Sequence, residues 1–193
     1  MLSSQVLDLY RESGALKEGH FRLSSGLHSD KYFQSALVLA QPRFAARLGA
    51  ALASRFKADD VDVVIGPAMG AIIIAHEVGR ALDRPVLFAE RVDDRFALRR
   101  GFAVHAGERA LLVEDVLTTG GSILELASVI ESSGAKVVAL GCLVDRRGKG
   151  HPISPPLESL AQVEVPTWKP DACPRCLAGA PMDVPGSRKR QLA

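Results

Sequence analysis

Apolar residues along this chain alternate between short continuous runs and longer stretches in which they recur every three or four positions. Four runs have the composition of strands buried on both faces, and they lie at 61–65, 86–89, 109–113 and 137–144. Four stretches have helical spacing, at 3–16, 42–56, 71–82 and 123–130. This alternation predicts an α/β fold, with a mostly parallel sheet flanked by helices and joined by right-handed crossovers.

Two further segments are expected to pack beside this sheet. Residues 20–33 are predicted to form two short strands around a Ser24-Ser25-Gly26 turn, as a hood over a site. The proline-rich tail from Gly150 is predicted to give a short helix near 156–161, an edge strand at 162–165 and a basic, frayed end at 185–190. We expect a single domain over 1–193, with a hood from about 1–40 plus the tail, and a core at about 41–150.

Composition narrows the class of protein. The 193 residues are 47% hydrophobic, which suits one α/β domain with a substantial core. A formal net charge of +2 is too small to argue for a nucleic-acid partner, and no apolar run has the length of a membrane span. The N-terminus lacks a basic region followed by an apolar segment, so we expect a cytoplasmic protein without nucleic-acid or membrane partners.

The three cysteines are too few for a disulfide framework. Cys142 falls in an apolar run and is expected in the core. Cys173 and Cys176 have the spacing of half a zinc site or of a redox pair. Because the sequence offers no second pair and no nearby histidine, the favoured interpretation is a structural turn with two thiols.

The strand at 109–113 runs into the most informative segment, Glu114-Asp115-Val116-Leu117-Thr118-Thr119-Gly120-Gly121-Ser122. Its hydroxyls and glycines precede a predicted helix, where free N–H groups and the helix dipole favour an anion. The two acids would repel this anion unless they face sugar hydroxyls or Mg²⁺, so the segment fits a ribose 5-phosphate. The alternative is a capping turn with two solvated acids, which does not require so many hydroxyls and glycines in succession.

Polar residues follow three other predicted strands, as Gly66-Pro67, Glu90-Arg91 and Asp145-Arg146. Ligands of open parallel sheets bind outside the carboxyl ends of the strands, so we expect these residues and Glu114-Asp115 to line one crevice. The charged segment 92–106 is predicted to be a mobile loop or a loose hairpin. Its arginines could bring positive charge over a diphosphate, although a solvated position is favoured for Arg95.

The segment Glu114 to Ser122 resembles the signature of the type I phosphoribosyltransferases, which bind 5-phosphoribosyl 1-diphosphate (PRPP). Taken with Gly19 to Tyr32, Gly66 to Gly70 and Asp145-Arg146, it makes the chain similar over nearly its whole length to the orotate phosphoribosyltransferases of that family. The resemblance implies the type I phosphoribosyltransferase-like fold. It also implies Mg²⁺-dependent transfer of a phosphoribosyl group from PRPP to orotate, giving orotidine 5′-monophosphate and diphosphate in pyrimidine biosynthesis.

The resemblance also implies roles for individual residues. The residues implied to bind PRPP are Arg91, Glu114, Asp115, Val116, Leu117, Thr118, Thr119, Gly120, Gly121 and Ser122. Those implied to bind the diphosphate are Gly66, Pro67, Ala68, Met69 and Gly70. Arg91 and Asp115 are the catalytic candidates, with Asp115 also near Mg²⁺. Arg146 and Thr118 would contact orotate, since a guanidinium fork suits a planar carboxylate.

The chain departs from better-known members of the family, which carry lysines in the hood, the diphosphate loop and the mobile loop. It has no lysine between Lys57 and Lys136, and Ser24 and Met69 stand where lysines would be expected. The positive charge would then come from Arg91, Arg99 and Arg100, together with Lys31 or His105. The resemblance further implies a homodimer, in which residues 92–106 close over the neighbouring subunit's site.

Two alternatives stay open. A regulator could sense PRPP without turning it over, and the missing lysines favour this slightly. A purine-type phosphoribosyltransferase would use the same PRPP loop with a different base. Arg146 separates these enzymes, because a purine has no carboxylate for it to bind.

Overall fold

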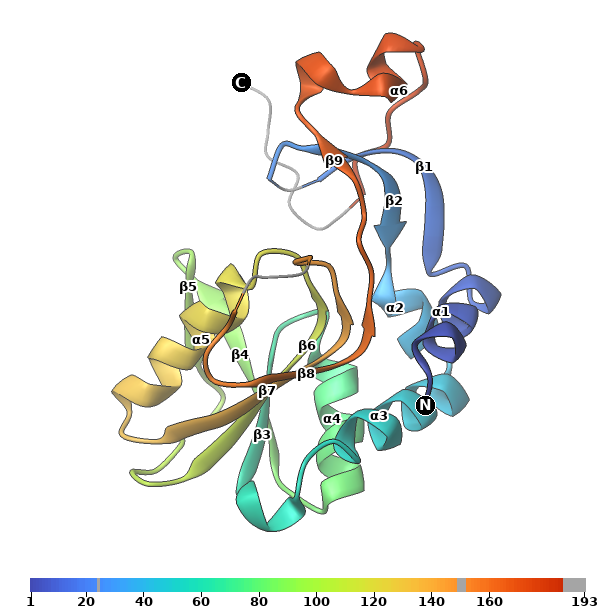
Figure 1. Cartoon of the computed structure of the whole chain (residues 1–193). Helices are drawn as coiled ribbons and strands as arrows, with labels where there is room; N and C mark the ends of the chain where they lie inside the picture. The colour runs from blue at the N-terminus through green and yellow to red at the C-terminus, as the bar shows by residue number, and fades with distance from the viewer. Residues whose placement is uncertain (24, 149–151, 186–193) are drawn as a thin grey trace.

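A computed structural model of the chain describes residues 1–23, 25–148 and 152–185 (Figure 1). Ser24 of the predicted turn and the basic end from residue 186 onward lie outside these described residues. The elements, in chain order, are α1 (Ser3–Glu12), β1 (Leu16–Arg22), β2 (His28–Phe33), α2 (Ser35–Leu39), α3 (Pro42–Ala53), η1 (Ala58–Asp60), β3 (Val63–Pro67), α4 (Ile72–Leu82), β4 (Val86–Val92), β5 (Arg95–Leu98), β6 (Arg109–Leu117), α5 (Gly121–Ser132), β7 (Lys136–Asp145), β8 (Leu157–Gln162), β9 (Thr167–Trp168), η2 (Pro170–Ala172) and α6 (Pro174–Leu177).

A six-stranded sheet forms the larger part of the molecule, in the order β5-β4-β3-β6-β7-β8. All neighbouring strands are parallel except the edge pair β4 and β5, which is antiparallel. The predicted α/β fold with a mostly parallel sheet is therefore confirmed.

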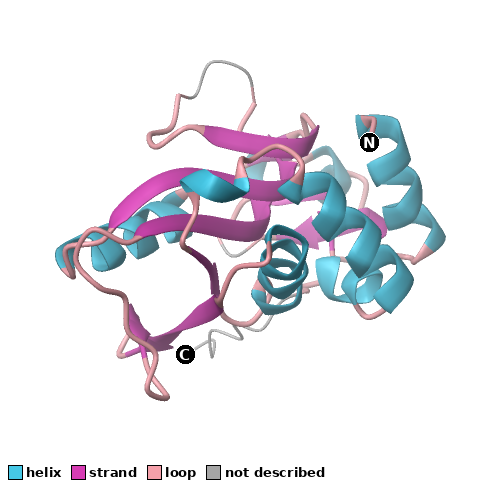
Figure 2. Cartoon of the chain, turned by 90° about the horizontal axis from the view of Figure 1, so that it is seen from below, coloured by secondary structure: helices cyan, strands magenta, loops and turns pink. Residues whose placement is uncertain are grey.

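Helices cover both faces of this sheet, and they account for the continuous apolar runs of its strands (Figure 2). One apolar cluster joins α1, α3 and α4 to one face, and α5 covers the other face with a second cluster. Leu111 of β6 belongs to the first cluster, whereas its neighbour Leu112 belongs to the second. Successive side chains of a strand point to opposite faces, so a strand covered on both sides needs apolar residues at every position.

A smaller, three-stranded sheet carries the N-terminal hairpin, in the order β1-β2-β9. The two predicted strands around residues 24–26 are confirmed as β1 and β2, which pair antiparallel. The tail returns along both outer edges of this hairpin. β9 pairs with β2, and Asp183 exchanges backbone hydrogen bonds of 2.8 and 2.9 Å with His20 and Arg22 on the edge of β1.

The prediction of a short helix near 156–161 is wrong. Residues 157–162 form β8, which extends the large sheet parallel to β7, and the edge strand expected at 162–165 lies here instead. The open edge of β7 offers backbone partners to an adjacent segment, whereas a helix of about six residues is marginal on its own. Figure 1 shows how the tail passes from β8 on the large sheet to β9 on the hood.

Several strands end later than the sequence predicted, and this matters for the site. β6 runs to Leu117 rather than to residue 113, because Glu114, Val116 and Leu117 continue the pairing with β7. β3 likewise continues through Gly66 and Pro67.

None of the described helices combines the length and apolar character needed to span a bilayer.

Candidate active site

A cavity of about 450 Å³ opens at the carboxyl ends of β3, β4 and β6. Its walls are the loop after β3, charged residues of β4 and β6, and the first turn of α5. The lining residues are Pro67, Ala68, Met69, Gly70, Glu90, Arg91, Phe96, Glu114, Asp115 and Ser122. Three of the four strand ends expected to share one crevice are thus brought together. The fourth, Asp145-Arg146, does not line this cavity.

Glu114 and Asp115 lie inside the paired part of β6, with Glu114 opposite Cys142 of β7. The Glu114 carboxylate accepts a hydrogen bond of 3.1 Å from the backbone N–H of Asp115. Burial raises the pKa of Glu114 well above its usual value, and the neighbouring charge of Asp115 adds to the effect. A cation or a set of hydroxyl donors in the cavity would favour the charged form of this pair.

The loop after β3 approaches Asp115 closely, and glycine makes this possible. A Cβ atom on Gly70 would lie 3.1 Å from Oδ1 of Asp115. A Cβ atom on Gly66 would lie 2.9 Å from Cβ of Ala75, so α4 also packs directly against the end of β3. Met69 of this loop is 81% exposed and lines the cavity.

The glycine- and hydroxyl-rich segment forms the N-terminus of α5. Gly120 is the N-cap residue with a φ of 84°, a conformation that glycine adopts without strain. Ser122 lines the cavity, and Thr118, Thr119 and Gly121 are exposed on the same turn. The side chains of Val116 and Leu117 instead pack against the apolar clusters. Any contact of these two residues with a ligand would therefore involve the backbone.

Arg91 lines the cavity but is already paired. Its guanidinium contacts both carboxylate oxygens of Glu125 in α5, at 3.2 and 2.9 Å, and lies 4.1 Å from the ring centroid of Phe96. Glu125 was not singled out from the sequence. Its only sequence signal is its position, three residues after Ser122 on the predicted helix.

The segment 92–106 begins as the predicted hairpin, with β5 antiparallel to β4. Arg100 forms an ion pair with Glu90, with contacts of 2.8 and 3.0 Å, and this hydrogen bonding lowers the pKa of Glu90. Arg95, Arg99 and His105 are exposed and do not line the cavity. The structure thus brings Arg91 to the cavity and leaves Arg99 and His105 outside it.

Arg146 lies between the large sheet and the hood. Its guanidinium is 5.6 Å from the ring centroid of Phe33, and burial lowers its pKa, an effect that Tyr32 and Asp30 oppose. Within the described residues, its Nε has no hydrogen-bond partner. A buried N–H group without a partner is costly, so this position suits an anionic group of a ligand.

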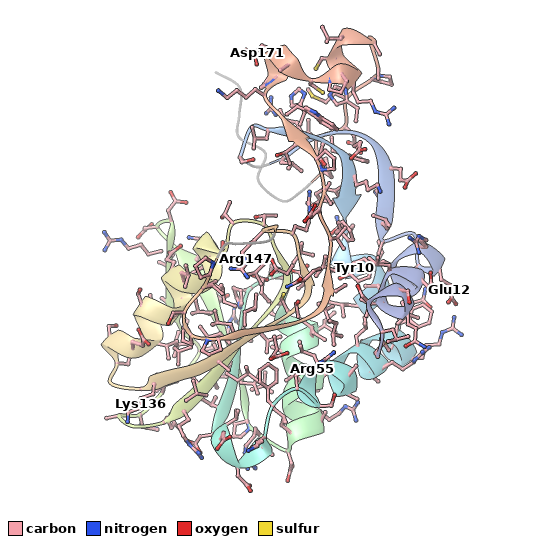
Figure 3. The ribbon with its side chains drawn as sticks, viewed as in Figure 1. Tyr10, Glu12, Arg55, Lys136, Arg147 and Asp171 are labelled. Atoms are coloured by element: carbon pink, nitrogen blue, oxygen red, sulfur yellow. The ribbon has the colours of Figure 1, made fainter. Side chains whose placement is uncertain are left out.

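Asp145 does not line the crevice as the sequence predicted. Its carboxylate is 4% exposed and pairs with Arg147, through contacts of 3.0 and 2.9 Å. This buried pair fixes the turn after β7, on the side of the large sheet that faces the hood (Figure 3). Arg147 is thus a further structural residue that the sequence reasoning missed.

The cysteine interpretation also needs correction, because histidines do lie near the pair. His20 of β1 and His28 of β2 contact Cys173 and Cys176 at the far end of the hood. Nothing near the pair in the sequence indicated this, since the histidines precede the cysteines by most of the chain.

Comparison with known proteins agrees with this geometry. Residues 35–169 match the model of the phosphoribosyl transferase domain. An orotate phosphoribosyltransferase of Pelotomaculum thermopropionicum is 47% identical over 98% of this chain and 100% of its own length, and one of Carboxydothermus hydrogenoformans is 48% identical with the same coverage. The chain belongs to the orotate phosphoribosyltransferase family.

Solved structures of this family share the fold. The orotate phosphoribosyltransferase of Aeropyrum pernix superposes with a TM-score of 0.67 at 25% identity, covering 82% of this chain and 93% of the other. An adenine phosphoribosyltransferase of Rhodothermus marinus superposes almost as well, with a TM-score of 0.66 at 18% identity, covering 83% and 99%. The fold is therefore shared by an orotate phosphoribosyltransferase and an adenine phosphoribosyltransferase.

Proposed function

We propose that the cavity at the ends of β3, β4 and β6 is the PRPP site of this phosphoribosyltransferase. The enzyme transfers the phosphoribosyl group of PRPP to orotate, giving orotidine 5′-monophosphate and diphosphate in pyrimidine biosynthesis. The observation that carries the assignment is the meeting of Glu114, Asp115, the Gly66–Gly70 loop and Ser122 in one cavity.

Each wall of the cavity suits one part of PRPP. The 5-phosphate binds at the N-terminus of α5, where the turn from Thr118 to Ser122 offers hydroxyls and free N–H groups. The diphosphate lies along the main chain of residues 66–70. The ribose hydroxyls bind Glu114 and Asp115, which returns the raised pKa of Glu114 toward its usual value.

The donor set also fits Mg²⁺, the cofactor that the resemblance implies. Two adjacent carboxylates that repel each other supply hard oxygen ligands, and Mg²⁺ commonly binds through one or two carboxylates together with substrate phosphates. Asp115 is the proposed protein ligand. When bound, the ion would neutralise charge that develops on the departing diphosphate.

Orotate binds at Arg146, with Thr118 nearby. The free Nε of Arg146 suits a carboxylate, which accepts two parallel hydrogen bonds from a guanidinium. The pKa of Tyr32 is raised by burial and by Asp115 and lowered by Arg146, so β2 of the hood lies within electrostatic reach of both groups. The hood therefore closes the side of the site where the base binds.

The remaining cations act from the edge of the sheet. Glu125 pairs with Arg91 and so holds its guanidinium at the cavity that is proposed to bind PRPP. Arg99, Arg100 and His105 would reach a diphosphate only from another subunit or after movement of the hairpin. The resemblance supports the first arrangement, in a cytoplasmic homodimer, and light scattering of the purified protein tests the dimer.

The test of the proposed function is orotate consumption, followed by ultraviolet absorbance with PRPP and Mg²⁺. Orotate should be lost only when PRPP and the metal are both present. If orotate persists while PRPP binds, the chain is a PRPP-sensing regulator. Consumption of a purine base in place of orotate would instead support the purine-type enzyme.

Arg146→Ala sharpens this test. Loss of a charged hydrogen-bonded pair costs about 1.5–3 kcal/mol, so kcat/KM for orotate should fall by about 10- to 150-fold while PRPP affinity is kept. Arg55→Ala is the matched control, because Arg55 is an exposed arginine just after α3 and does not line the cavity. Equal kcat/KM values for the two variants would contradict the proposed orotate site.

A further inference from the structure

Four potential metal ligands meet at the far end of the hood, away from the cavity. They are His20 of β1, His28 of β2, and Cys173 and Cys176 at the start of α6, and their ligand atoms all lie within 4.8 Å of one another. Three of the four residues are buried, and Cys176 is exposed. Figure 3 shows that this end of the hood, marked by Asp171 of η2, is well separated from Arg147 at the large sheet.

Four of the six distances between these ligand atoms are close to those around a single tetrahedral ion. Nε2 of His20 lies 3.0 Å from Nδ1 of His28 and 3.6 Å from the sulfur atoms of both cysteines. The sulfur of Cys176 lies 3.3 Å from Nδ1 of His28. Around a tetrahedral zinc ion, bonds of about 2.3 Å to sulfur and about 2.0 Å to nitrogen separate two nitrogens by about 3.3 Å, and a nitrogen from a sulfur by about 3.5 Å.

The outer contacts of the cluster also suit a metal site. Nδ1 of His20 lies 3.1 Å from the carbonyl oxygen of Ala180. An N–H group at this position would donate to the carbonyl and leave the lone pair of Nε2 directed at the cluster. Metal-binding histidines usually have such a partner on the second ring nitrogen, which fixes the tautomer and the ring orientation.

The hood has a structural need for a crosslink at this point. Neither of the two apolar clusters includes Phe21 or Cys173, the buried apolar residues at this end of the hood. The tail is held to the hairpin by the two-residue strand β9 and by the backbone contacts of Asp183. A small lobe without its own hydrophobic core commonly depends on a metal or a disulfide.

We propose that His20, His28, Cys173 and Cys176 form a structural zinc site that joins the N-terminal hairpin to the C-terminal tail. Two thiolates and two imidazoles in tetrahedral arrangement select zinc over the hard cations that carboxylates bind. With four protein ligands, the coordination is complete and leaves no open position for catalysis. The site is separate from the proposed Mg²⁺ site, which uses carboxylate oxygens on β6.

The first test measures metal in the full chain, purified under reducing conditions without chelator. Elemental analysis should find one zinc per chain, kept after dialysis against excess Mg²⁺. Replacement of zinc by Co²⁺ should produce thiolate-to-metal charge-transfer absorption and the intense visible bands of a tetrahedral ion. Carboxylates of the PRPP site cannot give the charge-transfer band, so this signal reports the hood alone.

Variants then identify the ligands. Cys176→Ser and His28→Gln should each lower the affinity for Zn²⁺ at least tenfold, since loss of even an outer-shell partner typically costs 10- to 100-fold. Cys142→Ala and His76→Asn are matched controls, because these residues lie in β7 and on the exposed side of α4, and they should keep one zinc per chain. Cys176→His retains a ligand, so it should bind Co²⁺ with a weaker charge-transfer band even if Cys176→Ser fails to fold.

Three results would overturn the proposal. The first is protein without zinc that also gives no thiolate band when Co²⁺ is added. The second is unchanged Zn²⁺ affinity in both Cys176→Ser and His28→Gln. The third is oxidation of Cys173 and Cys176 to a disulfide by air even when the reduced protein is offered excess Zn²⁺, which would make the pair a redox site. None of these results depends on the orotate assay, so the two proposals can fail separately.

Discussion

The large sheet and the hood are stabilised in different ways. The large sheet is covered on both faces, and each face has an apolar cluster that includes fully buried residues such as Leu111 and Leu112. At its far end, the hood has a three-stranded sheet, a buried Phe21 and a cluster of two histidines and two cysteines. Apolar burial scales with area, so a small lobe needs specific polar or metal-mediated links where a large one does not.

The two regions are also proposed to bind different parts of the substrates. The carboxyl end of the large sheet holds the groups proposed to bind PRPP, on rigid strands and at a helix N-terminus. The hood contributes β2, whose Tyr32 and Phe33 face Arg146. We therefore expect the position of the hood to affect binding of the base more than binding of the sugar phosphate.

The largest expected difference between the large sheet and the hood is in the free energy of unfolding lost when a buried side chain is truncated. Leu111→Ala removes a fully buried side chain of the large lobe and should lower the free energy of unfolding by about 2–5 kcal/mol. Phe21→Ala should lower the global value much less, because its lobe can open while the large sheet stays folded. Urea denaturation measures the global effect, and hydrogen exchange should show faster exchange confined to β1, β2 and β9. Equal global losses would show that the two lobes unfold as one unit.

A smaller effect is expected where the large lobe binds its substrate. Gly70→Ala would place a methyl group 3.1 Å from Oδ1 of Asp115 and should weaken PRPP binding by about tenfold, or about 1.4 kcal/mol. Gly141→Ala is the matched control, because its methyl group would lie 3.2 Å from the ring of Phe56, within the packed part of the lobe. Gly141→Ala should lower the melting temperature and leave PRPP affinity unchanged. Calorimetric titration and thermal melting separate the two effects, and weakened PRPP binding in both variants would contradict the assignment.

The smallest expected effect is a gain in stability at Glu114. The folded state raises the pKa of Glu114 above its unfolded value, so its ionisation destabilises the fold as the pH rises through this interval. Glu114→Gln removes that ionisation and should raise the melting temperature at neutral pH by about 2–4 °C for each kcal/mol gained. The gain should disappear below about pH 4, where an unfolded glutamate is also protonated.

The same variant should bind PRPP more weakly, because an amide replaces a carboxylate acceptor of the ribose hydroxyls. If the variant is more stable but binds PRPP more weakly, the carboxylate of Glu114 destabilises the fold and contributes to PRPP binding. Melting curves across pH, with and without PRPP and Mg²⁺, provide the measurement. A lower melting temperature at neutral pH would mean that the buried Glu114 charge is already compensated.

Much of the large lobe could be predicted because its signals are local. The runs that became β3, β4, β6 and β7 and the stretches that became α3, α4 and α5 follow from periodicity alone. The segment from Glu114 to Ser122 contains both the acids and the helix N-terminus within a few consecutive residues. Local backbone geometry and amphipathic spacing act over about ten residues, which is the range that a sequence pattern can report.

The errors lie where contacts between distant segments decide the outcome. Residues 157–162 form a strand because the edge of β7 is open beside them, a fact that no local pattern contains. The partner of Arg91 was missed for the same reason, because Glu125 lies 34 residues away in sequence. The pair of Asp145 with Arg147 is local, but it forms because the turn after β7 brings the two side chains together. Each of these partners depends on where the chain turns after a strand.

The sequence by itself determined the α/β fold, the positions of its main strands along the chain and the glycine- and hydroxyl-rich turn before α5, because each depends on neighbouring residues. Only the tertiary structure decided which polar groups meet. Cys173 approaches His20 across 153 residues, and it does so because the tail pairs with both edges of the hairpin. Strand pairing of this kind is set by backbone hydrogen bonding and chain path. It produces no periodic pattern in the sequence from which the cluster of two histidines and two cysteines could be predicted.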